Sequence, residues 1–408
     1  MQTTLSEGAR QLPRAEEAER ILRSCVHCGF CNATCPTYQL LGDELDGPRG
    51  RIYLIKQVLE GQPATATTQL HLDRCLSCRN CETTCPSGVD YHNLLDIGRA
   101  AMESSVPRPL GQRLLRAGLR AVLPNPTLFK SLSRLGQTFR PLLPERLRDE
   151  LPTTIPTTGP RPEPRHARRV LLLEGCVQAA LSPNTNTATA GVLDRLGISV
   201  TAVREAGCCG ALDYHLNAQE TGLNRARRTI DAWWPHIESG AVEAIIQTAS
   251  GCGAFIKDYG HLLEDDPAYA AKAARVSALS KDLVEVLRDE PLEDLGIHSE
   301  LRLAVHCPCT LQHGQKLGGA VEQVLTRLGF NLTPVPDSHL CCGSAGTYSI
   351  TQPQLSRQLR DNKMNALESG QPEVIATANI GCQTHLGGAG RTPVRHWIEL
   401  VEEALSQP

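Results

Sequence analysis

Long hydrophobic runs, aromatic side chains and a strong net charge are all missing from this sequence. No stretch approaches the roughly eighteen consecutive apolar residues of a transmembrane helix, so we expect no helix to span a membrane. Aromatic residues make up 4% of the chain and the net charge is −3, which argues against a nucleic-acid surface of basic and stacking side chains. The opening stretch MQTTLSEGARQLPRAEEAERIL has no apolar core of a signal peptide, so a cytoplasmic location is expected.

A dinucleotide-binding signature is missing too. No G-x-G-x-x-G follows a predicted strand, so the sequence gives no sign of a flavin or nicotinamide site. Cysteine, by contrast, is abundant, with 17 residues at short and repeated spacings. In a reducing compartment, clustered cysteines bind metals or carry redox chemistry instead of forming structural disulfides. The cysteines are therefore the candidate functional residues.

Two strings share the form C-x2-C-x2-C-x3-C-P: CVHCGFCNATCP at 25–36 and CLSCRNCETTCP at 75–86. This spacing is typical of [4Fe–4S] cubanes, and in two-cluster ferredoxins the fourth cysteine ligates the other cluster. Zinc also binds C-x2-C but uses two pairs of ligands, which fits the strings less well. We therefore predict two cubanes with crossed ligands: Cys25, Cys28, Cys31 and Cys85 for one, and Cys75, Cys78, Cys81 and Cys35 for the other.

Composition divides the chain into four segments. Residues 1–100 contain both strings and helical periodicity, which predicts a small α-helical ferredoxin-type domain. Residues 101–165 are rich in proline, leucine and arginine and form a basic amphipathic linker. Residues 166–290 and 300–405 resemble each other, which indicates an internal repeat. The expected fold class is therefore a multidomain α+β / α/β protein, with the helical two-cluster domain followed by two duplicated α/β domains.

The repeat is visible in aligned segments. RRVLLLEGC (168–176) matches LRLAVHCPC (301–309), and CCG occurs at 208–210 and again at 341–343. AIIQTASGC (244–252) matches VIATANIGC (374–382), and the step from the first cysteine to the CC pair is 32 residues in both copies. Short apolar runs predict buried strands, and each copy has cysteines just beyond strand ends, where open α/β sheets usually form their sites.

A CC-Gly between two distant cysteines resembles the cysteine-rich CCG domain. That domain occurs in heterodisulfide reductase, in the electron-transfer subunit of anaerobic glycerol-3-phosphate dehydrogenase and in lactate-utilisation proteins. The whole order, two ferredoxin strings and then two CCG repeats, resembles the glycolate oxidase iron–sulfur subunits, as do CCGSAGTYSIT (341–351) and NIGCQTHL (379–386).

This resemblance implies an electron-transfer subunit of a flavin-dependent glycolate oxidase. A separate flavoprotein (FAD) subunit would oxidise glycolate to glyoxylate, and this chain, without a substrate site of its own, would relay the electrons to a membrane quinone. It would then lie peripherally on the inner face of the cytoplasmic membrane. Three alternatives stay open: an equivalent subunit for glycerol-3-phosphate or lactate, a thiol–disulfide enzyme like heterodisulfide reductase, and a zinc scaffold.

The CCG repeats supply eight further candidate cofactor ligands: Cys176, Cys208, Cys209 and Cys252, then Cys309, Cys341, Cys342 and Cys382. The full CCG pattern ends in C-x-x-C, and five such cysteines hold a non-cubane cluster in heterodisulfide reductase. Here Phe255 and His385 replace the last cysteine. Each repeat could hold an additional cluster or zinc, with His385 as an imidazole ligand. Buried thiols and reversible disulfides are the alternatives, and Cys307 is interpreted as a buried or spare thiol.

Three further interpretations concern single residues and the linker. His306, with His215, His313 and His339, is interpreted as a hydrogen-bonded or surface histidine. Arg49 and Arg51 could stabilise reduced clusters, but solvated surface charge is the favoured interpretation. Residues 104–144 contain no acidic residue. Their basic and leucine-rich faces predict a helix on an anionic membrane or, preferably, one that packs on its own domains or on a partner.

Overall fold

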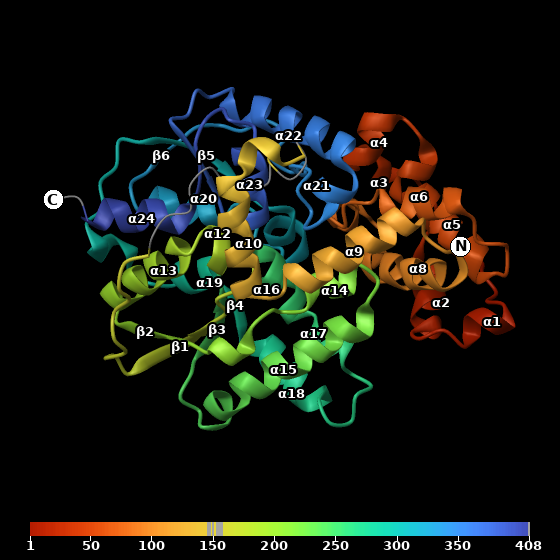
Figure 1. Cartoon of the computed structure of the whole chain (residues 1–408), viewed down its shortest axis with the longest axis horizontal. Helices are drawn as coiled ribbons and strands as arrows, with labels where there is room; N and C mark the ends of the chain where they lie inside the picture. Colours follow the sequence, from red (N-terminus) through yellow and green to blue (C-terminus); the bar gives the residue numbers. More distant parts are fainter. Residues whose placement is uncertain (145–147, 149–150, 152–157, 407–408) are drawn as a thin grey trace.

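The N-terminal region is built from helices wrapped around the two cysteine strings (Figure 1). This computed structural model describes residues 1–144, 148, 151 and 158–406. No strand occurs within the first 144 residues, all of which are described. The helices here are α1 (Glu7–Arg10), α2 (Ala15–Ser24), α3 (Phe30–Ala33), α4 (Pro36–Leu41), η1 (Glu44–Asp46), α5 (Pro48–Leu59), α6 (Ala66–Asp73), α7 (Asn80–Thr84) and α8 (Tyr91–Ser105).

The first repeat is a four-stranded parallel sheet with helices on both faces. Its strand order is β2-β1-β3-β4. The strands are β1 (Arg168–Leu172), β2 (Ile198–Ala202), β3 (Ala244–Gln247) and β4 (Ser280–Asp282). The helices are α12 (Gln178–Leu181), α13 (Asn184–Arg195), η3 (Arg204–Ala206), α14 (Ala211–His215), α15 (Gln219–Glu238), α16 (Ser250–Lys257), α17 (Tyr259–Leu262), α18 (Ala270–Leu279), α19 (Leu283–Leu287) and η4 (Leu292–Leu295).

The second repeat has the same topology, with strand order β6-β5-β7-β8 and parallel pairing throughout. Its strands are β5 (Arg302–His306), β6 (Asn331–Leu332), β7 (Val374–Thr377) and β8 (Val394–His396). Its helices are η5 (Thr310–Gly314), α20 (Ala320–Arg327), α21 (Tyr348–Thr351), α22 (Pro353–Glu368), α23 (Ile380–Gly387) and α24 (Trp397–Ser406). The identical strand order confirms the duplicated α/β fold.

Each repeat packs a helix from its C-terminal end against the other repeat. Helix α19, which follows the last strand of the first repeat, contacts α20 of the second, and α24 contacts α13 of the first. One apolar cluster therefore runs through both repeats and includes Leu172, Val192, Leu303, Val324 and Trp397. Burial of this shared core stabilises both repeats together, because neither sheet covers that face with its own helices alone.

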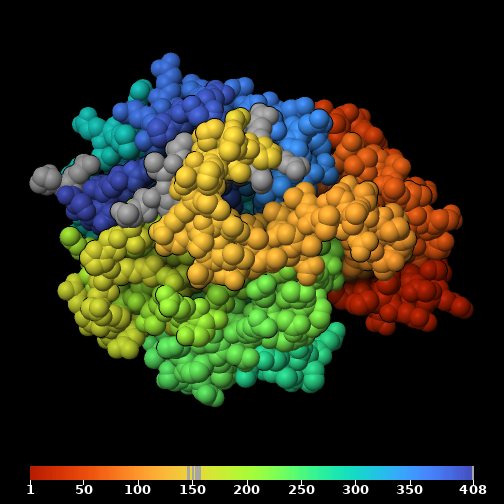
Figure 2. Space-filling view, viewed as in Figure 1, coloured from red at the N-terminus to blue at the C-terminus, as the bar shows by residue number. Residues whose placement is uncertain are grey.

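A pair of helices joins the N-terminal region to the repeats. Helices α9 (Leu110–Val122) and α10 (Pro126–Thr138), followed by η2 (Arg140–Leu142), cross the front of the molecule over the boundary between the first and second repeats (Figure 2). Asn125 caps α10 by accepting a hydrogen bond from the Leu128 amide, and Pro126 occupies its first turn. Among the helices of the described ranges, none is both long enough and apolar enough to cross a bilayer.

Candidate metal centres

The two cysteine strings fold into the same loop. His27 (φ 60°) and Gly29 (φ 87°) of the first string have left-handed backbone conformations, as do Ser77 (φ 53°) and Arg79 (φ 61°) at the equivalent positions of the second. Left-handed non-glycine residues cost free energy and persist only where the surrounding structure requires them. In both loops these residues alternate with the first three cysteines, so the backbone reverses around the thiols.

The first thiol set combines three cysteines of the first string with one of the second. The thiols of Cys25 and Cys31 have Cys85 as an electrostatic neighbour, and these three line a small cavity together with Cys28 and Tyr91. Burial, together with the neighbouring Cys25 and Cys85, raises the pKa of Cys31 to about 11. The structure thus brings together the four residues predicted to hold one cubane.

The second thiol set combines three cysteines of the second string with one of the first. The thiols of Cys78 and Cys81 both have Cys75, and Cys35 of the first string, as electrostatic neighbours. Burial is the main cause of the raised pKa values of Cys78 and Cys81. Where the strings cross, the hydroxyl oxygens of Thr34 and Thr84 lie 3.1 Å apart, and the Asn80 side-chain amide donates to the Thr34 carbonyl at 3.0 Å.

The donor sets fit iron–sulfur cubanes. Four thiols held together within an apolar core repel one another when ionised, and cluster iron relieves that repulsion because thiolates are its ligands. Two hydrogen-bond donors also approach one sulfur of the second set. The Ser77 amide lies 3.4 Å and the Tyr91 hydroxyl 3.7 Å from Cys75 Sγ. Hydrogen bonds to cluster sulfurs are among the factors that set a reduction potential.

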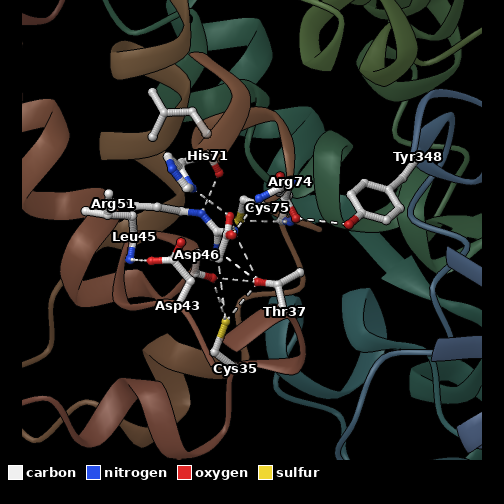
Figure 3. A network of polar contacts seen from close by, with 12 residues as sticks. Cys35, Thr37, Asp43, Leu45, Asp46, Arg51, His71, Arg74, Cys75 and Tyr348 are labelled. Carbon is white, nitrogen blue, oxygen red and sulfur yellow. Dashed lines mark hydrogen bonds and ion pairs between the residues drawn. The ribbon is translucent and has the colours of Figure 1, made fainter. Parts of the chain in front are cut away.

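A buried arginine lies beside the second set (Figure 3). Arg51 is 1% exposed and donates to the His71 carbonyl at 2.7 Å and to Thr37 Oγ1 at 3.1 Å, and its Nη1 lies 4.0 Å from Cys35 Sγ. Asp46 Oδ1 accepts from the guanidinium at 3.5 Å. The interpretation of Arg51 as a solvated surface charge is therefore wrong: helix α5 turns it inward, where its charge can balance thiolates.

Arg49, two residues earlier, faces outward. Its side chain is 34% exposed and pairs with Glu44 at 2.6 Å. The guanidinium also occupies the space above Gly29, where a Cβ would lie 2.5 Å from Nη1. Arg49 therefore has the surface position that the sequence suggested, and it covers the loop of the first set.

The second string also contacts the second repeat. The thiol of Cys78 has Cys309 as an electrostatic neighbour, and Cys78 packs into an apolar cluster that contains Cys309, Cys341 and Tyr348. The Tyr348 hydroxyl donates to the Arg74 carbonyl at 3.1 Å (Figure 3). The second thiol set is thus next to the thiols of the second CCG repeat.

In the first repeat all four CCG cysteines meet. Cys176 and Cys209 both contact Cys208, and Cys252 approaches Cys209 from α16. Hydrogen bonds from the thiols of Cys176 and Cys209 hold the pKa of Cys208 well below its usual range. Phe255, at the position of the missing cysteine, packs on the rings of Tyr214 and Tyr259 instead.

The second repeat gathers its four cysteines in the same way. Cys309 contacts Cys341, and Cys342 contacts Cys341 and Cys382. All four are buried. Cys307, two residues before Cys309, is also buried but lies in the apolar cluster shared by the two repeats. Both thiol sets offer four donors, which suits a metal ion or an iron–sulfur cluster.

The glycine of each CCG is required by geometry. Gly210 (φ 97°) and Gly343 (φ 93°) have left-handed backbone conformations. A Cβ on Gly210 would lie 2.4 Å from Gly222 O, and a Cβ on Gly343 would lie 2.5 Å from Ser356 O. Glycine thus lets the CC pair approach the following long helix, α15 or α22, in both repeats.

His306 and His385 of the second repeat are both buried. His385 Nε2 lies 3.1 Å from Ser356 Oγ of α22, and the suggestion of His385 as an imidazole ligand stays a prediction. His306, interpreted as hydrogen-bonded or exposed, is neither: it is 1% exposed, and neither ring nitrogen has a hydrogen-bond partner within the described part of the chain. Sequence reasoning missed it, although its place beside C-P-C at a strand end was a usable signal.

A cavity of about 790 Å³ opens between the N-terminal region and the two repeats. Helices α9 and α10 form one wall with apolar side chains, including Leu119 and Phe129. Cys75 of the second thiol set reaches the cavity. So do all four CCG cysteines of the first repeat, Cys176, Cys208, Cys209 and Cys252, whereas none of the second repeat's four is among its described lining residues.

The basic residues of the linker largely face inward. Arg108 pairs with Asp73 and Glu103, and Arg120 pairs with Asp213 at 2.8 Å. The linker therefore packs on its own domains, as the preferred alternative expected. Its exposed side chains include a set of large apolar ones: Leu110, Leu114, Leu128, Leu132, Leu135, Phe139 and Leu142.

Comparison with protein families agrees with this architecture. The 4Fe-4S dicluster domain matches residues 21–89, and the cysteine-rich domain matches twice, at 170–257 and 303–387. The two iron–sulfur clusters of the N-terminal region and the two CCG domains are thereby confirmed. The assignment of individual cysteines as ligands stays a prediction.

Three relatives span different shares of the chain. The glycolate oxidase iron-sulfur subunit of Escherichia coli (strain K12) is 70% identical over 407 residues and covers all of both chains. The probable glycolate oxidase iron-sulfur subunit of Bacillus subtilis (strain 168) is 32% identical over 96% of this chain and 95% of its own. Lactate utilization protein A of Bacillus velezensis is 30% identical over 54% of this chain and 91% of its own.

Proposed function

The chain belongs to the family of glycolate oxidase iron–sulfur subunits, and we propose that it carries electrons from a separate flavoprotein subunit to a membrane quinone. The flavoprotein removes two electrons and two protons from glycolate, which yields glyoxylate. This chain then passes the electrons on singly, since each cubane carries one electron at a time. The observation that supports this most strongly is the crossing of Cys35 and Cys85, which fixes the two four-thiol sets side by side.

The first thiol set is the proposed point where electrons enter. Cys28 is exposed, whereas Cys78 at the equivalent position of the second set is half-buried. Two large apolar side chains beside the first set are also exposed, Val26 at 68% and Phe30 at 63%. Two large apolar side chains exposed beside a redox site would suit a contact with a partner protein. We therefore assign this surface to the flavoprotein.

The cavity is the proposed quinone site. It is apolar, it reaches Cys75 of the second thiol set, and α9 and α10 form its wall. Binding sites of small apolar molecules are concave and lined mainly by hydrophobic side chains. The same two helices expose a row of leucines, so we place this face against the lipid from which a quinone arrives.

The test uses the tagged chain, purified anaerobically with its flavoprotein. Glycolate is expected to reduce both cubanes, seen as interacting signals in electron paramagnetic resonance, and then to support quinone reduction. Lactate and glycerol-3-phosphate serve as the comparison substrates. Reduction by either of these, with none by glycolate, would contradict the proposed substrate but leave the electron-carrier role intact. Zinc in place of iron would contradict both.

A further inference from the structure

His306 is the last residue of strand β5, and its imidazole lies within the thiol site of the second repeat. One of its ring nitrogens and the sulfur atoms of Cys342 and Cys382 all lie within 4.8 Å of one another. The side chain is 1% exposed, and both ring nitrogens lack a hydrogen-bond partner in the described ranges. Buried polar groups are nearly always paired, so this ring calls for a partner that is a ligand.

A buried cation lies beside the thiols of the second repeat. Lys363 of α22 is 3% exposed, and its ammonium donates to the Asp337 carbonyl at 2.7 Å. Its electrostatic neighbours are Cys309, Cys341 and Cys342. A cation at this place would balance part of the negative charge of a thiolate-ligated centre.

The fold itself does not need a histidine here. In the first repeat the aligned position is Leu173, which packs in an apolar cluster with Cys209 and Phe255. The two repeats share strand order and the CCG turn, so the same position accepts an apolar side chain without loss of the architecture. The imidazole is therefore specific to the second site.

We propose that His306 is a ligand, with Cys309, Cys341, Cys342 and Cys382, of an iron–sulfur centre in the second repeat. The inference rests on the proposed electron-carrier role and adds a third redox centre to it. Five donors exceed the four of a structural zinc site, and zinc has no redox chemistry. Cys309 and Cys341 pack against Cys78, so the centre adjoins the second cubane.

A candidate partner for the second ring nitrogen lies on the neighbouring strand. Thr377 pairs in register with His306 across β5 and β7, and its hydroxyl also lacks a partner among the described residues. A metal-bound histidine usually donates its other N–H to a nearby oxygen, which fixes the ring. Imidazole in place of thiolate raises the reduction potential of a cluster, so electrons from the second cubane would favour this centre.

The test is pulsed electron paramagnetic resonance on the full chain, purified anaerobically with ¹⁵N-labelled histidine and examined across a redox titration. We expect a ¹⁵N coupling on a centre distinct from the two cubanes. The coupling should vanish in His306→Leu, which copies the first repeat, and in His306→Cys, which should keep the iron content but lower the potential of that centre. His385→Asn is the matched control and should retain the coupling.

Three outcomes overturn the proposal: no histidine coupling in the wild type, a coupling that persists in both His306 variants, or one lost only in His385→Asn. Cubane signals without the coupling would refute this inference alone. Loss of the cubane signals themselves would refute the proposed electron-carrier role as well.

Discussion

The two CCG repeats share a framework but differ around their thiols. Both have the same strand order, the same left-handed glycine and four convergent cysteines. The first set lines the cavity, with Leu173 and Phe255 nearby, whereas the four cysteines of the second set are buried outside its described lining, beside His306 and Cys78. A duplicated fold can thus keep its backbone requirements while a few side chains give each copy a separate role.

Breaking the link between Cys78 and the second repeat should have the largest effect. Cys78→Ser removes a predicted ligand of the second cubane and the contact with Cys309. We expect loss of that cubane's signal and of glycolate-dependent quinone reduction, because no other set joins the first cubane to the cavity. Cys307→Ser is the control, since this buried thiol is outside both sets. Equal losses in the two variants would refute the assignment.

The last strand of each repeat ends on a buried titratable residue, Asp282 in the first and His396 in the second. Burial shifts their two pKa values in opposite directions. Burial raises the pKa of Asp282 to about 7, above its value near 3.8 in the unfolded chain, and Asp282 Oδ2 lacks a hydrogen-bond partner in the described structure. The folded state therefore holds its proton longer than the unfolded state, so stability falls as pH rises from about 4 to 7.

Asp282→Asn should remove this loss of stability with rising pH. The variant is expected to match the wild type near pH 4 and to exceed it by up to roughly 4 kcal/mol above pH 7, measured as the free energy of unfolding in urea. His396, at the equivalent strand end, has its pKa lowered by burial. The stability that the neutral His396 ring contributes is therefore lost as pH falls below about 6.5. A variant difference that is constant with pH would contradict this account of Asp282.

The shared framework predicts equal costs for the two CCG glycines. Gly210→Ala and Gly343→Ala each force a Cβ to within 2.4 or 2.5 Å of a backbone oxygen at positive φ. We expect each to lower the free energy of unfolding by about 2 kcal/mol or more, since left-handed strain alone costs about 1–3 kcal/mol. A cost in only one repeat would show that the turn is not a common requirement.

A smaller effect is expected at the cavity, which the CCG cysteines of the first repeat line and those of the second, in the described structure, do not. Leu119→Asn makes the cavity wall polar and is expected to raise the KM for a quinone analogue about tenfold, since burial of a leucine contributes about 1.5–3 kcal/mol. Electron transfer to a soluble dye should be unchanged. Leu135→Asn is the control, because Leu135 lies on α10 but outside the cavity lining. Similar KM values for both variants would exclude the cavity as the quinone site.

Much of this architecture could be predicted from sequence because it depends on local patterns. Apolar runs marked β1, β3, β5 and β7, and the aligned motifs marked the duplication. The strands β4 (Ser280–Asp282) and β8 (Val394–His396) gave no such signal, since they are three residues long and largely polar. Tertiary pairing with β3 and β7 forms them.

The features of the site that could not be predicted depend on contacts between distant segments. Arg51 looked like a surface charge because its partners Asp46 and His71 meet only in the fold. His306 looked ordinary because nothing local shows that both its nitrogens lack a partner among the described residues. The linker sequence favours packing on its own domains or on a partner, but it could not show that Asp73 and Asp213, from other regions, pair with its arginines.

The most direct test of the difference between the repeats is the iron and acid-labile sulfide content of anaerobically purified protein, compared between wild type, Cys309→Ser and Cys176→Ser. The account predicts more than about eight iron atoms per wild-type chain, the number in two cubanes. The surplus should disappear in Cys309→Ser and persist in Cys176→Ser. About eight iron atoms in all three proteins would contradict a redox centre in the second repeat.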